Sequence, residues 1–133
     1  MSMSPRAEQE IRACVGDPEV TFPDVVARLG AVGVERYTVD LVRAEKTFYQ
    51  PDGGSLRVDD ADGPQAPAVG FAADSVAAAV RTVQAGAIGY DEFCRRIAAA
   101  GCVGYCVSLP GQRVVYYGRT GDAHVEWFPG AAP

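Results

Sequence analysis

The stretch YDEFCRRIAAAGCVGYCVSLPGQRVVYYGRTGDAHVEWF, residues 90–128, contains the unit from which the chain is built. It begins with apolar residues at helical spacing and continues with three short segments in which apolar residues alternate. The same pattern occurs 68 residues earlier, at residues 22–58, without a gap. The sequence therefore predicts an internal duplication. Eight of the 37 paired positions are identical, and in the first copy they are Arg28, Ala31, Gly33, Tyr37, Val39, Leu41, Tyr49 and Gly53.

Each half is expected to contain two helices followed by an antiparallel meander of three strands. Helix signals include Pro23 in the first turn of the second helix, Ser75 as the cap of the third, and Gly33 and Gly101 just past helix ends. We therefore predict an α+β fold in which two αα-βββ units form one antiparallel sheet with helices packed on one face. The expected helices are 5–15, 22–32, 75–84 and 89–101, and the expected strands are 36–42, 45–50, 55–58, 103–109, 113–118 and 123–128.

A chain of 133 residues fits a single domain, residues 1–133. We divide it into a half-repeat at 5–58, a linker at 59–70, a half-repeat at 71–129 and a tail at 130–133. The linker reads DDADGPQAPAVG, lacks periodicity, and is expected to be mobile.

Charge and composition exclude several classes of function. The net charge of −5 argues against binding to nucleic acid, and no apolar run is long enough to cross a membrane or to form a signal peptide. We expect a cytoplasmic location, in which the four cysteines are reduced. These cysteines lack paired zinc-site spacing, and the chain has no phosphate loop, nucleophile elbow or HExxH motif. No cofactor and no metal site is expected.

The two copies differ most in their third strand. Leu56 and Val58 of the first copy align with His124 and Glu126 of the second, two residues apart and hence on one face of a strand. An imidazole beside a carboxylate, with Tyr117 and Tyr105 on adjoining strands, could form an acid–base or ligand-orienting cluster. His124, Glu126 and Tyr117 are therefore the candidate catalytic residues.

A one-residue slip in the second turn would give the opposite arrangement. Val125 and Trp127 would then take the places of Leu56 and Val58, and His124 and Glu126 would face solvent. Because a buried Trp is worth more to the fold than a buried imidazole–carboxylate pair, we expect Trp127 to face inward and His124 outward.

Six tyrosines suggest a recognition surface, since a phenol offers apolar area with a polar tip. In each of the pairs Phe48-Tyr49 and Tyr116-Tyr117, one ring must face the core and the other the open face of the sheet. Tyr105, Tyr117 and Trp127 are the candidate ligand-binding residues.

Four segments resemble the YdfO/YbcV-like family of small bacterial and prophage-borne domains of unknown function, sometimes labelled phage envelope protein. The resemblance covers residues 8–129, and its most specific part is the closing GRTGDAHVEWFP, where His124, Glu126 and Phe128-Pro129 match the family's HVE-x-FP ending. The chain departs from the family in the linker and at Trp127. The resemblance implies the α+β fold and a prophage origin, and it supplies no catalytic residue. The segments are FPDVVARLGAVGVERYTVDLV, TFYQPDGG, YDEFCRRIAAAGCVGYCV and VVYYGRTGDAHVEWFP.

Taken together, the residues favour a non-enzymatic cytosolic binding or protein-interaction module, with a protein partner or a homodimer as its context. The alternative is a small-molecule-binding protein or a hydrolase-like enzyme that uses His124, Glu126 and a neighbouring tyrosine.

Overall fold

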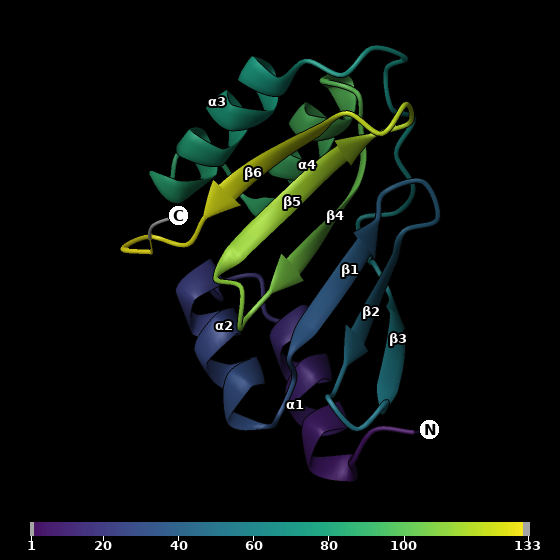
Figure 1. Cartoon of the computed structure of the whole chain (residues 1–133), viewed down its shortest axis with the longest axis vertical. Coiled ribbons are helices and arrows are strands. Elements are labelled where there is room, and N and C mark those ends of the chain that lie inside the picture. Colours follow the sequence, from purple (N-terminus) through teal and green to yellow (C-terminus); the bar gives the residue numbers. More distant parts are fainter. Residues whose placement is uncertain (1, 132–133) are drawn as a thin grey trace.

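The computed structural model describes residues 2–131, in which four helices accompany one six-stranded sheet (Figure 1). The helices and strands follow the predicted order, two helices and then three strands, in each half. The first half consists of α1 (Pro5–Val15), α2 (Phe22–Ala31), β1 (Arg36–Asp40), β2 (Glu45–Tyr49) and β3 (Ser55–Asp59). The second consists of α3 (Ala73–Gln84), α4 (Tyr90–Ala99), β4 (Cys102–Ser108), β5 (Arg113–Gly118) and β6 (Ala123–Trp127).

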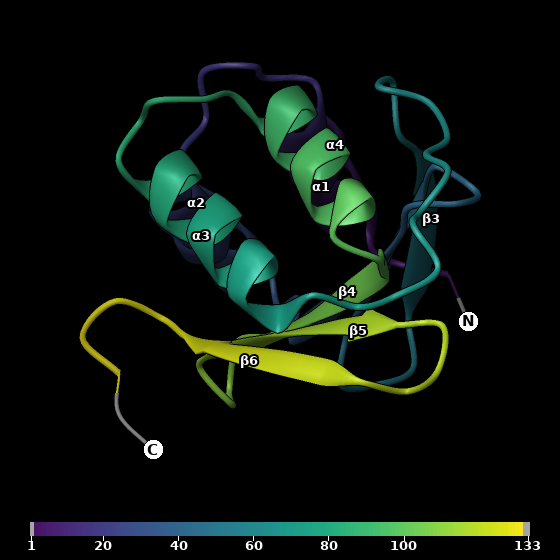
Figure 2. The same cartoon turned by 90° about the horizontal axis from the view of Figure 1, so that it is seen from above.

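The strands form one antiparallel sheet in the order β3-β2-β1-β4-β5-β6. All four helices lie on the same side of this sheet, as the view from above shows (Figure 2). The predicted α+β fold is confirmed. The opposite side of the sheet has no helix on it, and we call it the open face.

The two halves meet at the central strands β1 and β4, where Thr38 pairs with Cys106. These two residues are 68 apart, so equivalent positions of the two halves lie directly opposite each other. The remaining ladders repeat with the same shift: Phe48 pairs with Leu56, and Tyr116 with His124. The halves are therefore related by an approximate two-fold axis through the centre of the sheet.

Local signals explain most of the helix starts. Ser4 caps α1 through the Ala7 amide, and Thr21 caps α2 through the Asp24 amide. The predicted cap of α3 at Ser75 is wrong, because α3 begins at Ala73. The amide of the preceding residue, Ala72, donates to the Ala100 carbonyl at 2.7 Å, which fixes the chain two residues earlier than the serine.

Alternation along the strands decides which side chains enter the core. Phe48 and Tyr116 are buried beneath the helices, whereas Tyr49 and Tyr117 lie on the open face, as predicted for the two aromatic pairs. Burying one aliphatic residue such as Ile97, which has no exposed surface, stabilises the fold by about 2 kcal/mol. None of the helices within residues 2–131 is long and apolar enough to cross a bilayer.

The linker between the halves is held in place by backbone hydrogen bonds. The Gln65 amide donates to the Leu41 carbonyl at 2.8 Å, and the Ala68 amide donates to the Ala98 carbonyl at 3.0 Å. Arg119 adds a bond to the Pro67 carbonyl at 2.8 Å. Both halves therefore offer carbonyls to the segment that the sequence predicts to be mobile.

Gly33 and Gly101 follow α2 and α4 with φ angles of 84° and 89°, as predicted for glycines past helix ends. Their surroundings differ. A Cβ on Gly33 would meet only the Gln50 side chain at 3.4 Å, whereas a Cβ on Gly101 would lie 2.0 Å from the Gly70 carbonyl oxygen of the linker.

Replacing Gly33 with Ala should therefore lower the free energy of unfolding by about 1 kcal/mol, the cost of a left-handed alanine. Replacing Gly101 with Ala should cost clearly more, because the linker backbone must also move. Urea denaturation of both variants measures the difference. Equal losses at the two positions would contradict the packing of the linker against Gly101.

Candidate functional site on strand β6

Strand β6 places His124 and Glu126 on the helix-covered side of the sheet. His124 lies opposite Tyr116 and Glu126 opposite Val114, and both partners are buried core residues. Glu126 itself is 8% exposed. The expectation that Trp127 faces inward and His124 outward is therefore wrong, and the gap-free alignment of the two halves gives the correct register.

The turn before β6 explains this register. The Gly118 amide bonds to the Asp122 carbonyl at 2.8 Å, and in the first half the Gln50 amide bonds to the Gly54 carbonyl at the same distance. The two turns thus have equal length, so a one-residue slip does not occur. The signal was present in the sequence as the aligned glycines Gly53 and Gly121, which both have positive φ.

Three side chains from two elements make the site, which we call the Arg81–Glu126–His124 cluster. Arg81 of α3 donates to Glu126 through Nη1 at 2.7 Å and through Nη2 at 3.4 Å. The second carboxylate oxygen also bonds to Nε2 of His124. Sequence reasoning found the histidine and the glutamate and missed Arg81, since nothing in its own helix marks it as their partner.

The electrostatics of the cluster favour an ionised Glu126. Burial by itself would raise the pKa of this carboxyl group, but the hydrogen bonds from Arg81 and His124 outweigh burial and lower the pKa below its ordinary value. The side chain of Arg81 is 63% exposed. A buried carboxylate is thus held between one exposed cation and one imidazole.

A hollow of about 420 Å³ opens beside the cluster, between α3 and the outer edge of β6. Its polar groups come from two elements, Arg81 and Gln84 of α3 and His124 and Glu126 of β6. Its apolar wall is formed by Val125, Trp127 and Pro129.

Tyr117 was predicted to share a site with His124 and Trp127 to bind a ligand, but both side chains lie on the open face of the sheet. Tyr117 is on the open face, one sheet thickness from His124, so the sheet separates the predicted catalytic trio. Trp127 also faces that side, where the Arg113 guanidinium lies 4.7 Å from the centroid of its ring. This cation–π contact stabilises a half-exposed Trp by about 0.5–1 kcal/mol.

Tyr105 is buried in the core and is closed to ligands. Its hydroxyl is 2.5 Å from that of Tyr90, and the Lys46 ammonium lies 4.3 Å from the centroid of the Tyr90 ring. Burial raises the pKa of Tyr105 well above its ordinary range. The three predicted ligand-binding residues therefore do not share a surface, and Trp127 alone borders the hollow.

The residues that line the hollow determine which groups it can offer to a ligand. The described residues that line it include no serine, cysteine or tyrosine that could act as a nucleophile beside His124. The carboxylate orients the imidazole through Nε2, but Arg81 neutralises that carboxylate. The cluster can offer hydrogen bonds and an exposed cation to a ligand.

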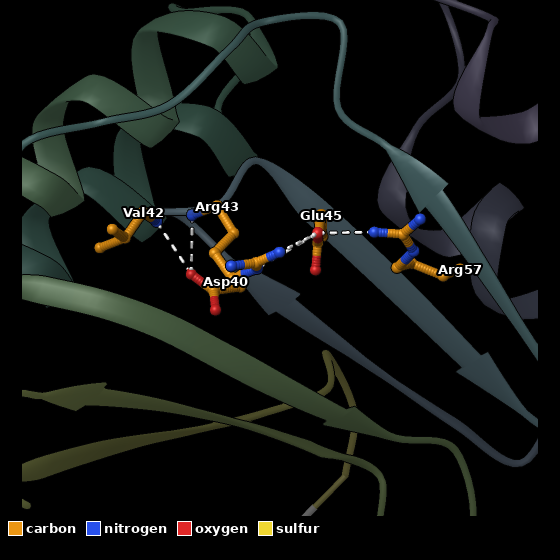
Figure 3. A network of polar contacts seen from close by, with 5 residues as sticks. All are labelled: Asp40, Val42, Arg43, Glu45 and Arg57. Carbon is orange, nitrogen blue, oxygen red and sulfur yellow. Dashed lines mark hydrogen bonds and ion pairs between the residues drawn. The ribbon is translucent and has the colours of Figure 1, made fainter.

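A second polar network, at the other end of the sheet, is a solvated surface feature. Arg43 and Arg57 both donate to Oε1 of Glu45, at 3.2 and 2.7 Å, while Asp40 accepts from the Val42 and Arg43 amides (Figure 3). The hydrogen bond from Arg43 is the main cause of a lowered pKa at Glu45. The two guanidiniums are more than half exposed, so this network contributes little to stability.

Residues 64–126 match the model of a family described as a protein of unknown function (DUF1398). The match begins in the linker, spans α3 to β5, and ends at Glu126, so it contains the whole Arg81–Glu126–His124 cluster. No curated protein matches the chain. The matched family has no described function, so the role of these residues is inferred from the geometry of the site.

The first half has no such cluster, because Leu56 and Val58 occupy the equivalent positions. Glu126→Val alone should destabilise the protein by about 1–3 kcal/mol, since Arg81 and His124 lose their acceptor. The double variant His124→Leu, Glu126→Val should recover to wild-type stability or above, because apolar pairs often replace buried ion pairs at no cost. Urea denaturation of the single and the double variant measures the two free energies of unfolding. A double variant less stable than Glu126→Val would mean that the cluster has a structural role.

The lowered pKa of Glu126 also predicts a pH dependence. Its contribution to stability is complete above the unfolded pKa of about 4.3 and is lost as the pH falls through the lower folded value. Glu126→Gln should therefore cost about 1 kcal/mol near neutral pH and progressively less below about pH 4. Thermal or urea unfolding as a function of pH measures this, with the exposed Glu8→Gln as the matched control. A cost that does not fall in acid would contradict the ion pair.

Proposed function

We propose that the protein is a non-enzymatic interaction module that binds an extended segment of another polypeptide along β6. The observation that carries the proposal is the free edge of this strand. Within residues 2–131 no segment pairs with the outer edge of β6, which ends the sheet. Such an edge presents unpaired backbone donors and acceptors to any extended chain.

The backbone groups that point outward can be assigned. Phe128 donates to the Gln112 carbonyl and Gly118 donates to the Asp122 carbonyl, both at 2.8 Å. Since alternate residues of an antiparallel strand bond to the same neighbour, His124 and Glu126 bond to β5. The N–H and C=O groups of Ala123, Val125 and Trp127 then face away from the sheet and are available to a partner.

The opposite edge of the sheet supports the proposal by contrast. At β3, Ser2 forms a parallel bridge with Ser55, so the N-terminal segment covers the start of that edge. Arg57 carries a charge at the middle of β3, a feature that discourages pairing. Its equivalent on β6 is Val125, which is 42% exposed and apolar.

The side chains around β6 define the segment that would fit. On the helix side, Arg81, Gln84 and His124 offer hydrogen-bond donors at the hollow, which suits polar or acidic side chains. On the open face, Val125 and Trp127 offer apolar surface. We therefore expect a ligand strand in which polar and apolar residues alternate.

A small molecule in the hollow is the second candidate, and the volume of about 420 Å³ with its converging polar groups favours it. Such a ligand would depend on His124 and Arg81 and not on the backbone of β6. Loss of binding in His124→Ala together with unchanged binding in Val125→Pro would identify this case.

We also propose that the chain arose by duplication, with half-repeats at 5–58 and 71–129, and that it is a cytoplasmic member of the YdfO/YbcV-like family of prophage origin. The register shift of 68 supports duplication. Free thiols support a reducing compartment, since all four cysteines are unpaired.

Selection of short peptides from a random display library against the purified protein tests the function. Selected peptides should bind the wild type and should lose about fivefold or more in affinity for Val125→Pro, because proline removes an outward N–H worth about 1 kcal/mol. Arg57→Pro is the matched control, since it places the same change at the equivalent residue of β3. Both variants should fold, because edge strands tolerate proline where the N–H faces outward. Peptides that bind Val125→Pro and the wild type equally would contradict the proposal.

A further inference from the structure

We infer that the segment bound along β6 is β6 of a second copy, so that the protein forms a homodimer with one continuous sheet. This inference rests on the proposed function, since it names the occupant of the same edge. The two strands would run antiparallel about a two-fold axis at Val125, with both sets of helices on the same side of the joined sheet.

The sequence of β6, Ala-His-Val-Glu-Trp, is complementary to itself in this arrangement. With Val125 opposite its own copy, His124 lies opposite Glu126 of the second copy, and Ala123 lies opposite Trp127 of the second copy. An imidazole can hydrogen-bond to the carboxylate opposite it, and a small residue leaves room for the large one that it faces. Each partner therefore supplies what the other presents.

The backbone supports the same register. Ala123, Val125 and Trp127 point their N–H and C=O groups outward, so these residues would form the hydrogen-bonded pairs of the new ladder. His124 and Glu126 would form the non-hydrogen-bonded pairs, in which side chains approach most closely. His124 and Glu126 thus fall at the positions where side chains of the two strands can form a hydrogen bond most easily.

The hollow becomes part of the interface in this arrangement. Glu126 of the second copy would approach His124 from beyond the outer edge of β6, where the hollow lies, so that His124 would lie between two carboxylates. Arg81 is well placed to balance the added negative charge, since its side chain is 63% exposed. The second copy would thus extend the Arg81–Glu126–His124 cluster.

The other edge cannot form the equivalent dimer. Pairing of β3 with its own copy about Arg57 would place two guanidiniums opposite each other, and like charges directly opposite are destabilising. The bridge between Ser2 and Ser55 also occupies part of that edge. Self-association is therefore expected at β6 and not at β3.

The mass of the full chain in solution tests the inference, measured by sedimentation across a wide range of concentration. The wild type and Arg57→Pro should both dimerise, and the dissociation constant of Val125→Pro should be at least about tenfold higher. Val125→Cys should form a disulfide-linked dimer on mild oxidation, because Cα atoms of a hydrogen-bonded pair lie about 5.5 Å apart, within reach of a disulfide. Arg57→Cys should not form one. The wild type is the blank for the native cysteines, of which Cys14, Cys94 and Cys102 are buried.

The outcomes separate the inference from the proposed function. A monomer at every concentration, or a dimer unaffected by Val125→Pro, would overturn the inference. If selected peptides still bind β6 in that case, the function stands and only the inference is wrong. If such peptides also fail to bind, both proposals are wrong. Dimerisation that is lost in Val125→Pro and kept in Arg57→Pro supports both.

Discussion

The pairing of β1 with β4 is the interaction on which the rest of the structure depends. It places Thr38 opposite Cys106, so that two equivalent residues meet at the centre of the sheet. Every other ladder then follows outward in the same register on both sides, and the sheet ends in two equivalent strands, β3 and β6. The helices cover one side only, since each half contributes its pair to the same layer (Figure 2). Differences between the halves therefore appear at the edges, and β6 carries the most informative one.

Much of the fold could be predicted from the sequence because local and periodic signals agreed. The repeat at a shift of 68, the glycines past α2 and α4, and the alternation of Phe48-Tyr49 and Tyr116-Tyr117 all have direct physical causes. The orientation of β6 was predicted wrongly because burial of Trp127 was expected to stabilise the fold more than burial of the His124–Glu126 pair. Turn length fixed the register instead, and the stack of Trp127 on Arg113 recovers part of the lost burial.

The candidate site was only partly predictable. His124 and Glu126 could be found because they interrupt an apolar pattern that the first half preserves. Arg81 could not be found, because it comes from a helix 45 residues away in sequence, and only the packing of α3 over β6 brings it to the carboxylate. Tyr117 was assigned to the site because it lies on a neighbouring strand. Its side chain nevertheless leaves the sheet on the opposite side, which strand alternation alone would have indicated once the register was known.

Under the proposed function, β6 combines a polar inner face with a free outer edge. His124 and Glu126 take the places that Leu56 and Val58 occupy in β3, so this position of the fold is filled by an apolar pair in one half and a polar pair in the other. The polar pair lies beside unpaired backbone groups and the hollow, where a bound segment would contact it. The edge of β3 carries Arg57 and the Ser2 bridge, whereas the edge of β6 carries the exposed Val125, so the two edges of a nearly symmetric scaffold differ.

Hydrogen exchange at the individual amides of β6 tests this account most directly. The account predicts that the His124 and Glu126 amides exchange slowly at every protein concentration, because they bond to β5. The Val125 amide should exchange quickly in dilute solution and become protected as the concentration rises. Slow exchange of Val125 in dilute solution would mean that the edge is already covered. Fast exchange of His124 and Glu126 would mean that the strand is shifted by one residue, and either result would contradict the account.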